Sequence, residues 1–291
     1  MKKFLIVLLA IAIIVLMFFF LREVFTGRLI LKNYIVRIGR LEIRWYSVLI
    51  ITGIFLSYYI ARRRAEKEGV NPEHLDEVLV YGIIAGVIGA RIYYVVFRWD
   101  YYSKNFSEIF KIWHGGLAIH GAVIAAILTG FLYTRLKKNV SFTFLQGLDI
   151  FTGVLPLGQA IGRWGNFFNY EAFGVPTNLP WKMFVPEKFR PMEFRNQDFF
   201  HPTFLYESLW DLFVFYALTV YYRKYRKRFG EVTALYLILY SIGRFFIEGL
   251  RVDSLMLGNY RIAKIISLVF IVIGIILLIY LRSSRVEKKA S

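Results

Sequence analysis

One apolar segment of the sequence carries charges where a membrane helix rarely has them. The stretch LILYSIGRFFIEGLRVD begins like a bilayer span and then admits two arginines and a glutamate. Tyr240, Arg244, Glu248 and Arg251 have the spacing that puts residues on one face of a helix. An arginine at membrane depth is costly and normally faces protein or a water-filled cavity. The stripe predicts a polar cavity, and an Arg244–Glu248 pair that only joins helices stays open as the alternative.

A second polar group lies in the stretch GQAIGRWGNFFNYEAFG, residues 158–174. The guanidinium of an arginine presents a planar fork that suits phosphate oxygens, and each asparagine supplies a donor and an acceptor. The glycines would let a ligand or another backbone come close. A close-packed loop whose amides are satisfied by hydrogen bonds is the alternative. The candidate residues of this group are Arg163, Asn166, Asn169, Glu171 and Gly174.

His120 and Tyr46 are the remaining candidates for chemistry. Histidine is the side chain best suited to proton transfer near neutral pH, although a hydrogen-bonded core histidine is the commoner case. Tyr46 could hydrogen-bond a ligand or could be an aromatic residue of the membrane interface. His114 and His120 are too far out of phase to share a helical face, and no HExxH motif follows. The sequence therefore predicts neither a metal site nor a cofactor.

Arginines outnumber acids among these candidates, and they lie within apolar runs. Arg91 is one more arginine of this kind, for which an ion pair with Asp149 or Glu207 is the expected role. An excess of positive charge inside the membrane predicts an anionic ligand. A phospholipid headgroup is the abundant candidate.

The elements that must position these residues are helices. Hydrophobic residues make up 57% of the 291 residues, in runs of about twenty, the length that crosses a bilayer. They predict an all-α polytopic membrane protein with about eight transmembrane helices. The fifth span is the least regular, because Asp149, Pro156 and several glycines interrupt it. The expected spans are residues 4–21, 45–61, 78–97, 117–134, 142–162, 204–222, 232–249 and 262–281.

The distribution of Lys and Arg predicts the orientation in the membrane. These residues are more than twice as dense in one set of loops as in the other, which places both termini in the cytoplasm. Residues 1–22 are then an uncleaved signal anchor, residues 45–281 the transmembrane core and residues 282–291 a cytoplasmic tail. The segment 166–203 becomes a small cap on the outer face, where the polar cavity would open. The net charge of +17 fits basic loops at a lipid surface, and no polar domain is large enough to bind nucleic acid.

Five motifs in order carry a family resemblance. They are GRWGNFFN followed by Glu171 and Gly174, GGLAIHG around His120, NLPW, HPTFLYES, and YSIGRFFIEGLR. From about residue 44 to residue 280 the chain resembles the bacterial prolipoprotein diacylglyceryl transferases. That family usually has seven spans, so the anchor is an addition to a seven-helix core. Tyr170 and Ala122 stand where the family commonly has glycine, which puts the local backbone geometry in question.

The resemblance implies a membrane transferase. The family moves the diacylglyceryl group of phosphatidylglycerol to the lipobox cysteine of a preprolipoprotein signal peptide, forming a thioether and releasing glycerol phosphate. The bacterial cytoplasmic membrane is its expected place, membrane lipids are its surroundings, and the thiol belongs to the substrate because this chain has no cysteine. A phospholipid transporter or flippase is the alternative. We predict His120, Arg163 and Arg244 as catalytic residues, and Tyr46, Asn166, Asn169, Glu171, Gly174, Tyr240, Glu248 and Arg251 as substrate-binding residues.

Overall fold

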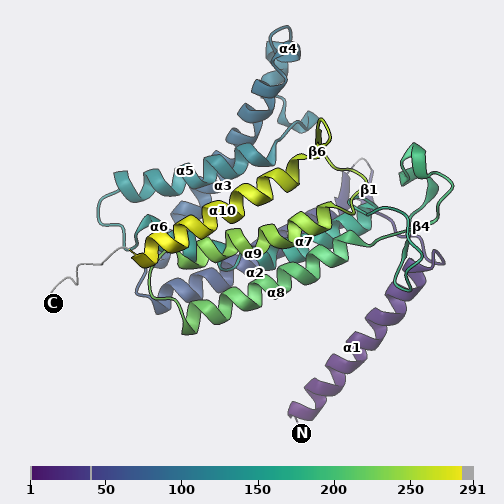
Figure 1. Cartoon of the computed structure of the whole chain (residues 1–291), viewed down its shortest axis with the longest axis horizontal. Coiled ribbons are helices and arrows are strands. Elements are labelled where there is room, and N and C mark those ends of the chain that lie inside the picture. Colours follow the sequence, from purple (N-terminus) through teal and green to yellow (C-terminus); the bar gives the residue numbers. More distant parts are fainter. Residues whose placement is uncertain (1, 40, 284–291) are drawn as a thin grey trace. The chain divides into compact units, whose positions relative to one another are not determined.

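A computed structural model describes residues 2–39 and 41–283 as a mostly helical chain with three short β hairpins (Figure 1). The chain divides into two compact units. One consists of residues 1–57 and 152–291, and the other of residues 58–151.

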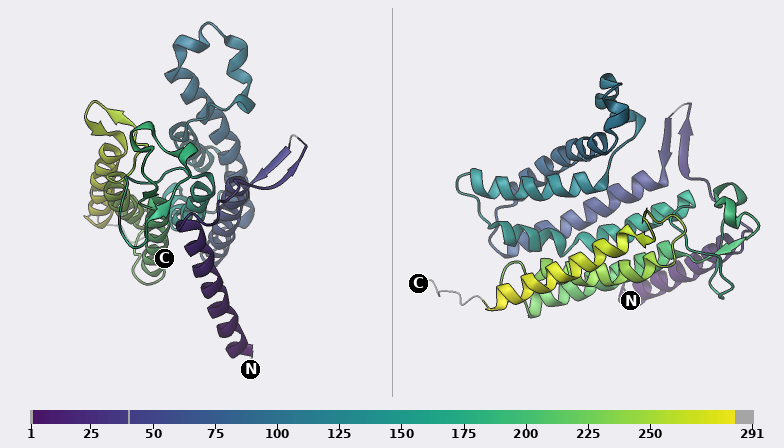
Figure 2. Two further views of the ribbon diagram at one scale, coloured as in Figure 1. Left: turned by 90° about the vertical axis from the view of Figure 1, so that its right-hand side faces the viewer. Right: turned by 45° about the horizontal axis from the view of Figure 1, so that its top comes forward.

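The first unit contains a layer of neighbouring helices. Its helices are α1 (Lys2–Phe25), the first half of α2 (Trp45–Lys67), α7 (Leu155–Asn169), α8 (Thr203–Lys224), α9 (Glu231–Glu248) and α10 (Ile262–Ser283). Helix α7 packs against α8, α8 against α9, and α9 against α10, as the views in Figure 1 and Figure 2 show. Two hairpins join the helices, β1 (Tyr34–Ile38) with β2 (Leu41–Arg44) and β5 (Met256–Leu257) with β6 (Tyr260–Arg261).

Five helical segments within the described residues are long and apolar enough to cross a membrane. They are Trp45–Lys67, Pro72–Phe97, Ile119–Leu136, Phe144–Asn169 and Ile262–Ser283. Helices α8 and α9 carry buried acids and an arginine inside otherwise apolar sequence. Because these charges lower their apolar character, α8 and α9 do not have the composition of plain spans. The membrane class is thus supported, and the count of eight spans remains a prediction.

The interruption expected in the fifth span is a break between two helices. Helix α6 (Phe144–Thr152) ends before α7 begins at Leu155, and Pro156 occupies the first turn of α7. Proline is tolerated there because the first backbone N–H groups of a helix have no partner within the helix. Helix α7 then continues to Asn169, so the stretch from Arg163 onward is helical and the connecting segment starts at Tyr170.

The segment from Tyr170 to Pro202, called the cap below, connects α7 to α8, and the predicted place of residues 166–203 on the outer face stays a prediction. The cap contains β3 (Met183–Phe184) paired with β4 (Phe199–Phe200), and two short 3₁₀ turns, η3 (Glu187–Phe189) and η4 (Met192–Phe194). Its core is aromatic and includes the last turn of α1. The buried residues of this cap core are Val24, Phe167, Tyr170, Phe173, Met183, Val185, Phe200 and Phe204. The rings of Phe25 and Phe167 pack against each other with centroids 6.1 Å apart.

The second unit is built on two helices in close contact. Its elements are the second half of α2, α3 (Pro72–Phe97), α4 (Trp99–Tyr102), η1 (Phe106–Phe110), η2 (Ile112–His114), α5 (Ile119–Leu136) and most of α6. Helix α3 begins where Asn71 accepts a hydrogen bond from the backbone N–H of Glu73. A Cβ atom on Gly89 would lie 2.6 Å from the carbonyl oxygen of Gly121, so the two helices can touch only through glycine.

Arg91 of α3 organises the long connection between α3 and α5. In place of the ion pair expected from the sequence, its guanidinium donates to backbone carbonyls. The accepting oxygens belong to Glu108 at 2.5 Å, Ile109 at 2.8 Å, Lys111 at 3.5 Å, Gly115 at 2.8 Å and Gly116 at 3.0 Å. Arg91 therefore holds a loop in one conformation.

Candidate active site

The charged residues of the first unit gather around one carboxylate. Glu207 lies in the second turn of α8, where its side chain is only 6% exposed. Its Oε2 atom lies 2.5 Å from Nε of Arg163 on α7. Its Oε1 atom accepts a hydrogen bond from Arg244 on α9 and lies 3.6 Å from the guanidinium of Arg251. Three arginines from separate segments of the chain thus converge on Glu207.

The pair that the sequence offered as a simple alternative is present as one part of this cluster. Nη2 of Arg244 lies 2.6 Å from Oε2 of Glu248, one helical turn further along α9. Since Arg244 also binds Glu207, the pair does not account for the whole stripe. Mutual neutralisation makes these charges tolerable inside apolar helices, because a buried ion without a partner is far more costly than a paired one.

Arg251 lies beyond the end of α9 and forms the outer edge of the cluster. Its guanidinium makes two parallel hydrogen bonds to Asp253, at 2.9 and 2.8 Å. Burial alone would raise the pKa of Asp253, but the hydrogen bond and the charge of Arg251 outweigh burial, so the pKa lies below its ordinary value. Arg261 on β6 donates to the backbone oxygens of Glu248 and Arg251, and so fixes this turn.

A small polar cavity lies within the cluster. Its volume is about 10 Å³, and its lining residues are Arg163, Glu207, Trp210, Asp211, Tyr240, Arg244 and Ile247. Sites for drug-sized ligands usually measure roughly 300–1,000 Å³. The side chains therefore nearly close the site around their own ion pairs. Among the residues that the structure describes, Oδ2 of buried Asp211 has no hydrogen-bond partner.

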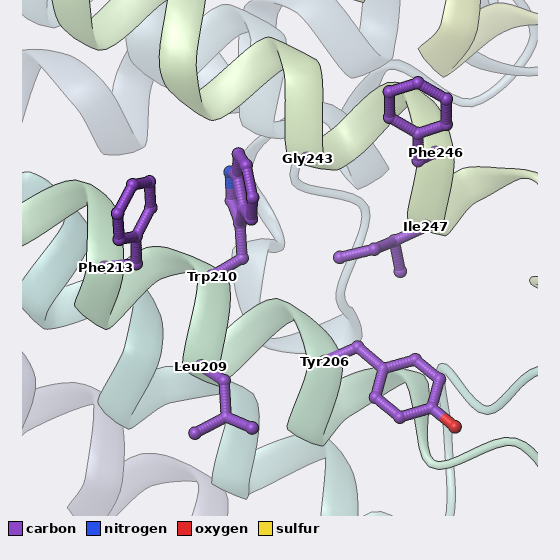
Figure 3. Close-up of a pocket in the computed structure, with 7 residues that line it drawn as sticks. All are labelled: Tyr206, Leu209, Trp210, Phe213, Gly243, Phe246 and Ile247. Carbon is purple, nitrogen blue, oxygen red and sulfur yellow. The ribbon is translucent and has the colours of Figure 1, made fainter.

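An apolar groove lies next to the polar cavity, between α8 and α9. Its volume is about 400 Å³, and Figure 3 shows its lining residues: Tyr206, Leu209, Trp210, Phe213, Gly243, Phe246 and Ile247. Trp210 and Ile247 line both spaces, so they form the wall between them. The indole of Trp210 packs onto Gly243 and donates to the carbonyl of Leu239 at 2.9 Å. An apolar chain in the groove would end beside the charged cluster.

The asparagines of the second sequence group share one acceptor. Nδ2 of Asn166 lies 2.8 Å from Oε1 of Glu171, and Nδ2 of Asn169 lies 3.2 Å from the same oxygen. The side chain of Glu171 is exposed, while Oδ1 of Asn169 is buried and without a hydrogen bond within the described part of the chain. The alternative of a close-packed segment with satisfied amides therefore stays open, because the Nδ2 groups of both asparagines donate to Glu171.

The backbone around Glu171 is unusual. Tyr170 and Ala172, on either side of it, have φ angles of 51° and 57°, a left-handed conformation that costs side-chain-bearing residues roughly 1–2 kcal/mol each. Tyr170 is one of the two positions at which the resemblance predicts glycine. Its hydroxyl accepts a hydrogen bond from the backbone N–H of Leu31 at 2.9 Å, and its ring stacks on Phe189. These contacts hold the strained turn in place.

Tyr46, Gly174 and Tyr240 also belong to the first unit. The ring of Tyr46 packs on α7, where a Cβ atom on Gly165 would lie 2.6 Å from it. Gly174 bridges to Arg251 through the backbone, and a Cβ atom there would lie 2.7 Å from His201. Packing therefore explains the glycine. Tyr240 lines the polar cavity.

His120 lies in the second unit, at the start of α5. It is exposed, and its ring stacks on Tyr93 with centroids 5.9 Å apart. Its assignment as a proton acceptor stays a prediction.

Sequence reasoning missed Glu207 as the centre of the charged cluster and did not single out Asp211. The available signal was two acids with helical i, i+4 spacing in an apolar run, within and just after the motif HPTFLYES.

The motif HPTFLYES also supplies His201 and Tyr206, whose side chains lie 3.2 Å apart, and burial lowers the pKa of His201. The indole of Trp181, from the motif NLPW, donates to the hydroxyl of Tyr206 at 2.7 Å.

Together, the fold and the site define a helical membrane protein with a buried polar site rich in arginine. The family model of prolipoprotein diacylglyceryl transferases matches residues 33–280, and the chain belongs to this family. A phosphatidylglycerol–prolipoprotein diacylglyceryl transferase of Thermotoga petrophila is 62% identical over 276 residues, which cover 95% of this chain and 94% of the relative. The relative of the same name from Fervidobacterium nodosum is 58% identical over 258 residues, covering 89% of this chain and 88% of its own.

Proposed function

We propose that this protein transfers the diacylglyceryl group of phosphatidylglycerol to the thiol of the lipobox cysteine in a prolipoprotein, and releases glycerol phosphate. The family match and the names of the relatives support the reaction class. The observation that carries the proposal is the convergence of Arg163, Arg244 and Arg251 on one buried position. Such a position suits a single anion with several oxygens.

The arginines would act on the leaving group. The sulfur attacks the glyceryl carbon that bears the phosphate ester, a C–S bond forms, and the C–O bond breaks with its electron pair going to the phosphate. Negative charge grows on the phosphate oxygens as this bond breaks. Preorganised cationic donors in a water-poor site stabilise that charge strongly. Arg163 and Arg244 take this role, and Glu248 orients Arg244 through their 2.6 Å ion pair.

The remaining residues of the site would position the two substrates. Asn166, Asn169 and Glu171 present amide and carboxylate groups to the headgroup hydroxyls. Tyr46 and Tyr240 supply further hydroxyls, and Arg251 meets the phosphate at the mouth of the cavity. Gly174 keeps the start of the cap close to Arg251, because the two residues form a backbone bridge. The groove between α8 and α9 accommodates an acyl chain or the apolar helix of a signal peptide.

A group on the enzyme must take the proton of the thiol, because the thiolate is the nucleophile. His120 is our candidate. Imidazole can accept a proton near neutral pH, and His120 is exposed at the start of its helix.

The protein acts in the bacterial cytoplasmic membrane in this proposal. About eight helices cross it, both termini face the cytoplasm, and the cap and the polar cavity open to the outer side. The density of Lys and Arg in the alternate loops supports this orientation. The prolipoprotein reaches the site from the outer leaflet.

Purified protein incubated with phosphatidylglycerol and a synthetic lipobox peptide tests the function. We expect the peptide to gain the mass of one diacylglyceryl group on its cysteine. A peptide with serine in place of that cysteine and vesicles of phosphatidylcholine alone are the controls. If phosphatidylglycerol moves between leaflets while the peptide mass stays unchanged, the protein is a lipid transporter and the proposal fails.

A further inference from the structure

Glu207 occupies the place where the proposed function puts the lipid phosphate. Its carboxylate meets Arg163 at 2.5 Å, Arg244 through a hydrogen bond and Arg251 at 3.6 Å. The arginine side chains are 12–21% exposed, whereas that of Glu207 is 6% exposed. Arg163, Arg244 and Glu207 all line the cavity, and Glu207 is the least exposed of the three.

A phosphodiester cannot simply be added to this cluster. The three arginines already have three carboxylate partners, Glu207 and Glu248 in the interior and Asp253 at the edge of the cluster. The carboxyl group of Asp211 also lines their cavity. One more buried anion without a matching cation would be strongly unfavourable. The cavity of about 10 Å³ also leaves no room for a phosphate beside the existing ion pairs. An incoming phosphate must therefore take the place of an anion that is already there.

Glu207 is the carboxylate best suited to leave the arginines. It lies on α8, whereas the arginines lie on α7, on α9 and just after α9, so one change of its side-chain rotamer frees all three. Glu248 is bound to Arg244 within the same helix, and its backbone is fixed by Arg261. Within the described residues, Oε2 of Glu207 has its ion pair but no hydrogen bond of ordinary geometry.

A carboxylate is a close substitute for a phosphodiester. Both carry one negative charge and offer two oxygens to the fork of a guanidinium. We propose that Glu207 is an internal placeholder anion: it holds the three arginines in position before the lipid arrives and gives them up to the lipid phosphate. This inference rests on the proposed function only in taking phosphatidylglycerol as the ligand.

Replacing Glu207 with glutamine tests the proposal, because the amide keeps the shape and removes the competing charge. Binding of phosphatidylglycerol by E207Q should tighten on the order of tenfold, since the lipid no longer displaces a charged hydrogen-bonding partner. The measurement is lipid binding to purified protein in phosphatidylcholine nanodiscs with increasing phosphatidylglycerol, without peptide. In the transfer assay, KM for phosphatidylglycerol should fall by a similar factor, while kcat does not rise.

D211N is the matched control. Asp211 lines the same cavity and is also buried, so this change converts a neighbouring carboxyl group to an amide and leaves the ion pairs of Glu207 in place. Displacement of Glu207 by the lipid phosphate predicts a clearly smaller gain in lipid binding for D211N than for E207Q. Equal gains would mean that the loss of either carboxyl group from the cavity has this effect, and would overturn the proposal.

A purely structural ion pair predicts the opposite result for E207Q. Folded E207Q that binds phosphatidylglycerol as weakly as the wild type, or more weakly, would overturn the placeholder. If E207Q does not fold, E207D gives the answer: its shorter side chain keeps the charge but reaches the arginines less well, and lipid binding should still tighten. Wild-type protein that binds the lipid but never lipidates the peptide would contradict the proposed function. The comparison of lipid binding between E207Q and the wild type would still test the placeholder.

Discussion

Arg91 in one unit and Arg163 with Arg244 in the other are arginines within apolar helices, yet they are satisfied in different ways. Arg91 is 7% exposed and gives its donors to backbone carbonyls of the loop between α3 and α5. Arg163 and Arg244 are bound to side-chain carboxylates. A backbone carbonyl cannot leave without refolding its loop, whereas a carboxylate can change rotamer. The bonds of Arg91 to the backbone therefore suit a structural role. The bonds of Arg163 and Arg244 to carboxylates suit the exchange of one anion for another.

Loss of either exchangeable arginine should have the largest effect. Arg163→Ala and Arg244→Ala should each lower transferase activity on the order of 10²- to 10³-fold, because the growing charge on the phosphate loses a partner. The assay is lipidation of the peptide at equal amounts of folded protein. Arg244→Lys should recover only part of the activity, since lysine lacks the planar fork. Near-normal lipidation by either alanine variant would remove the arginines from the chemistry.

His120→Gln tests whether the second unit contributes to the reaction. Removal of a general base should lower kcat on the order of 10²-fold. A residue that only positions the peptide would instead change KM for the peptide more than kcat. The measurement is kcat and KM for the lipobox peptide, for both proteins at equal amounts of folded enzyme. A variant with unchanged kcat would remove His120 from the proton transfer.

Arg91→Ala should act on stability more than on chemistry. Removal of the guanidinium leaves several carbonyls without their donor, so we expect the free energy of unfolding to fall by about 2–4 kcal/mol. Thermal unfolding in detergent measures the change. Activity per folded molecule should fall much less than in Arg244→Ala. If Arg91→Ala and Arg244→Ala lost equal activity, and the Tm of Arg91→Ala were unchanged, the distinction between a structural and an exchangeable arginine would be wrong.

The smallest effect is expected at the turn around Glu171. Tyr170→Phe removes only the hydroxyl that accepts from Leu31, at a cost of about 1 kcal/mol in stability. Proteolysis of the cap should become faster while the ring still stacks on Phe189. Phe18→Ala, at an exposed position of α1, is the control and should leave the cap unchanged. A Tyr170→Phe variant as resistant as the wild type would show that the hydrogen bond does not hold the turn.

Local sequence signals predicted much of this chain. Apolar runs gave the helices, Pro156 marked the break before α7, and helical spacing gave the contact between Arg244 and Glu248. Each of these signals depends on residues close together in the chain. Glu207 was missed as a centre because its partners come from other helices, and periodicity does not say which faces of two helices meet. The left-handed turn at Tyr170 was equally hidden, since Leu31, 139 residues away, helps to hold it.

The burial of the last turn of α1 in the cap core has a consequence for biosynthesis. Val24 and Phe25 leave the ribosome early, and their partners Met183 and Phe204 follow only after several more helices have been made. Until these residues have been synthesised, the last turn of α1 cannot pack into the cap core. Contacts between distant parts of a chain form late. The cap core is thus completed only after the start of α8 has been made, so folding of this part of the molecule must join its first helix to segments made much later.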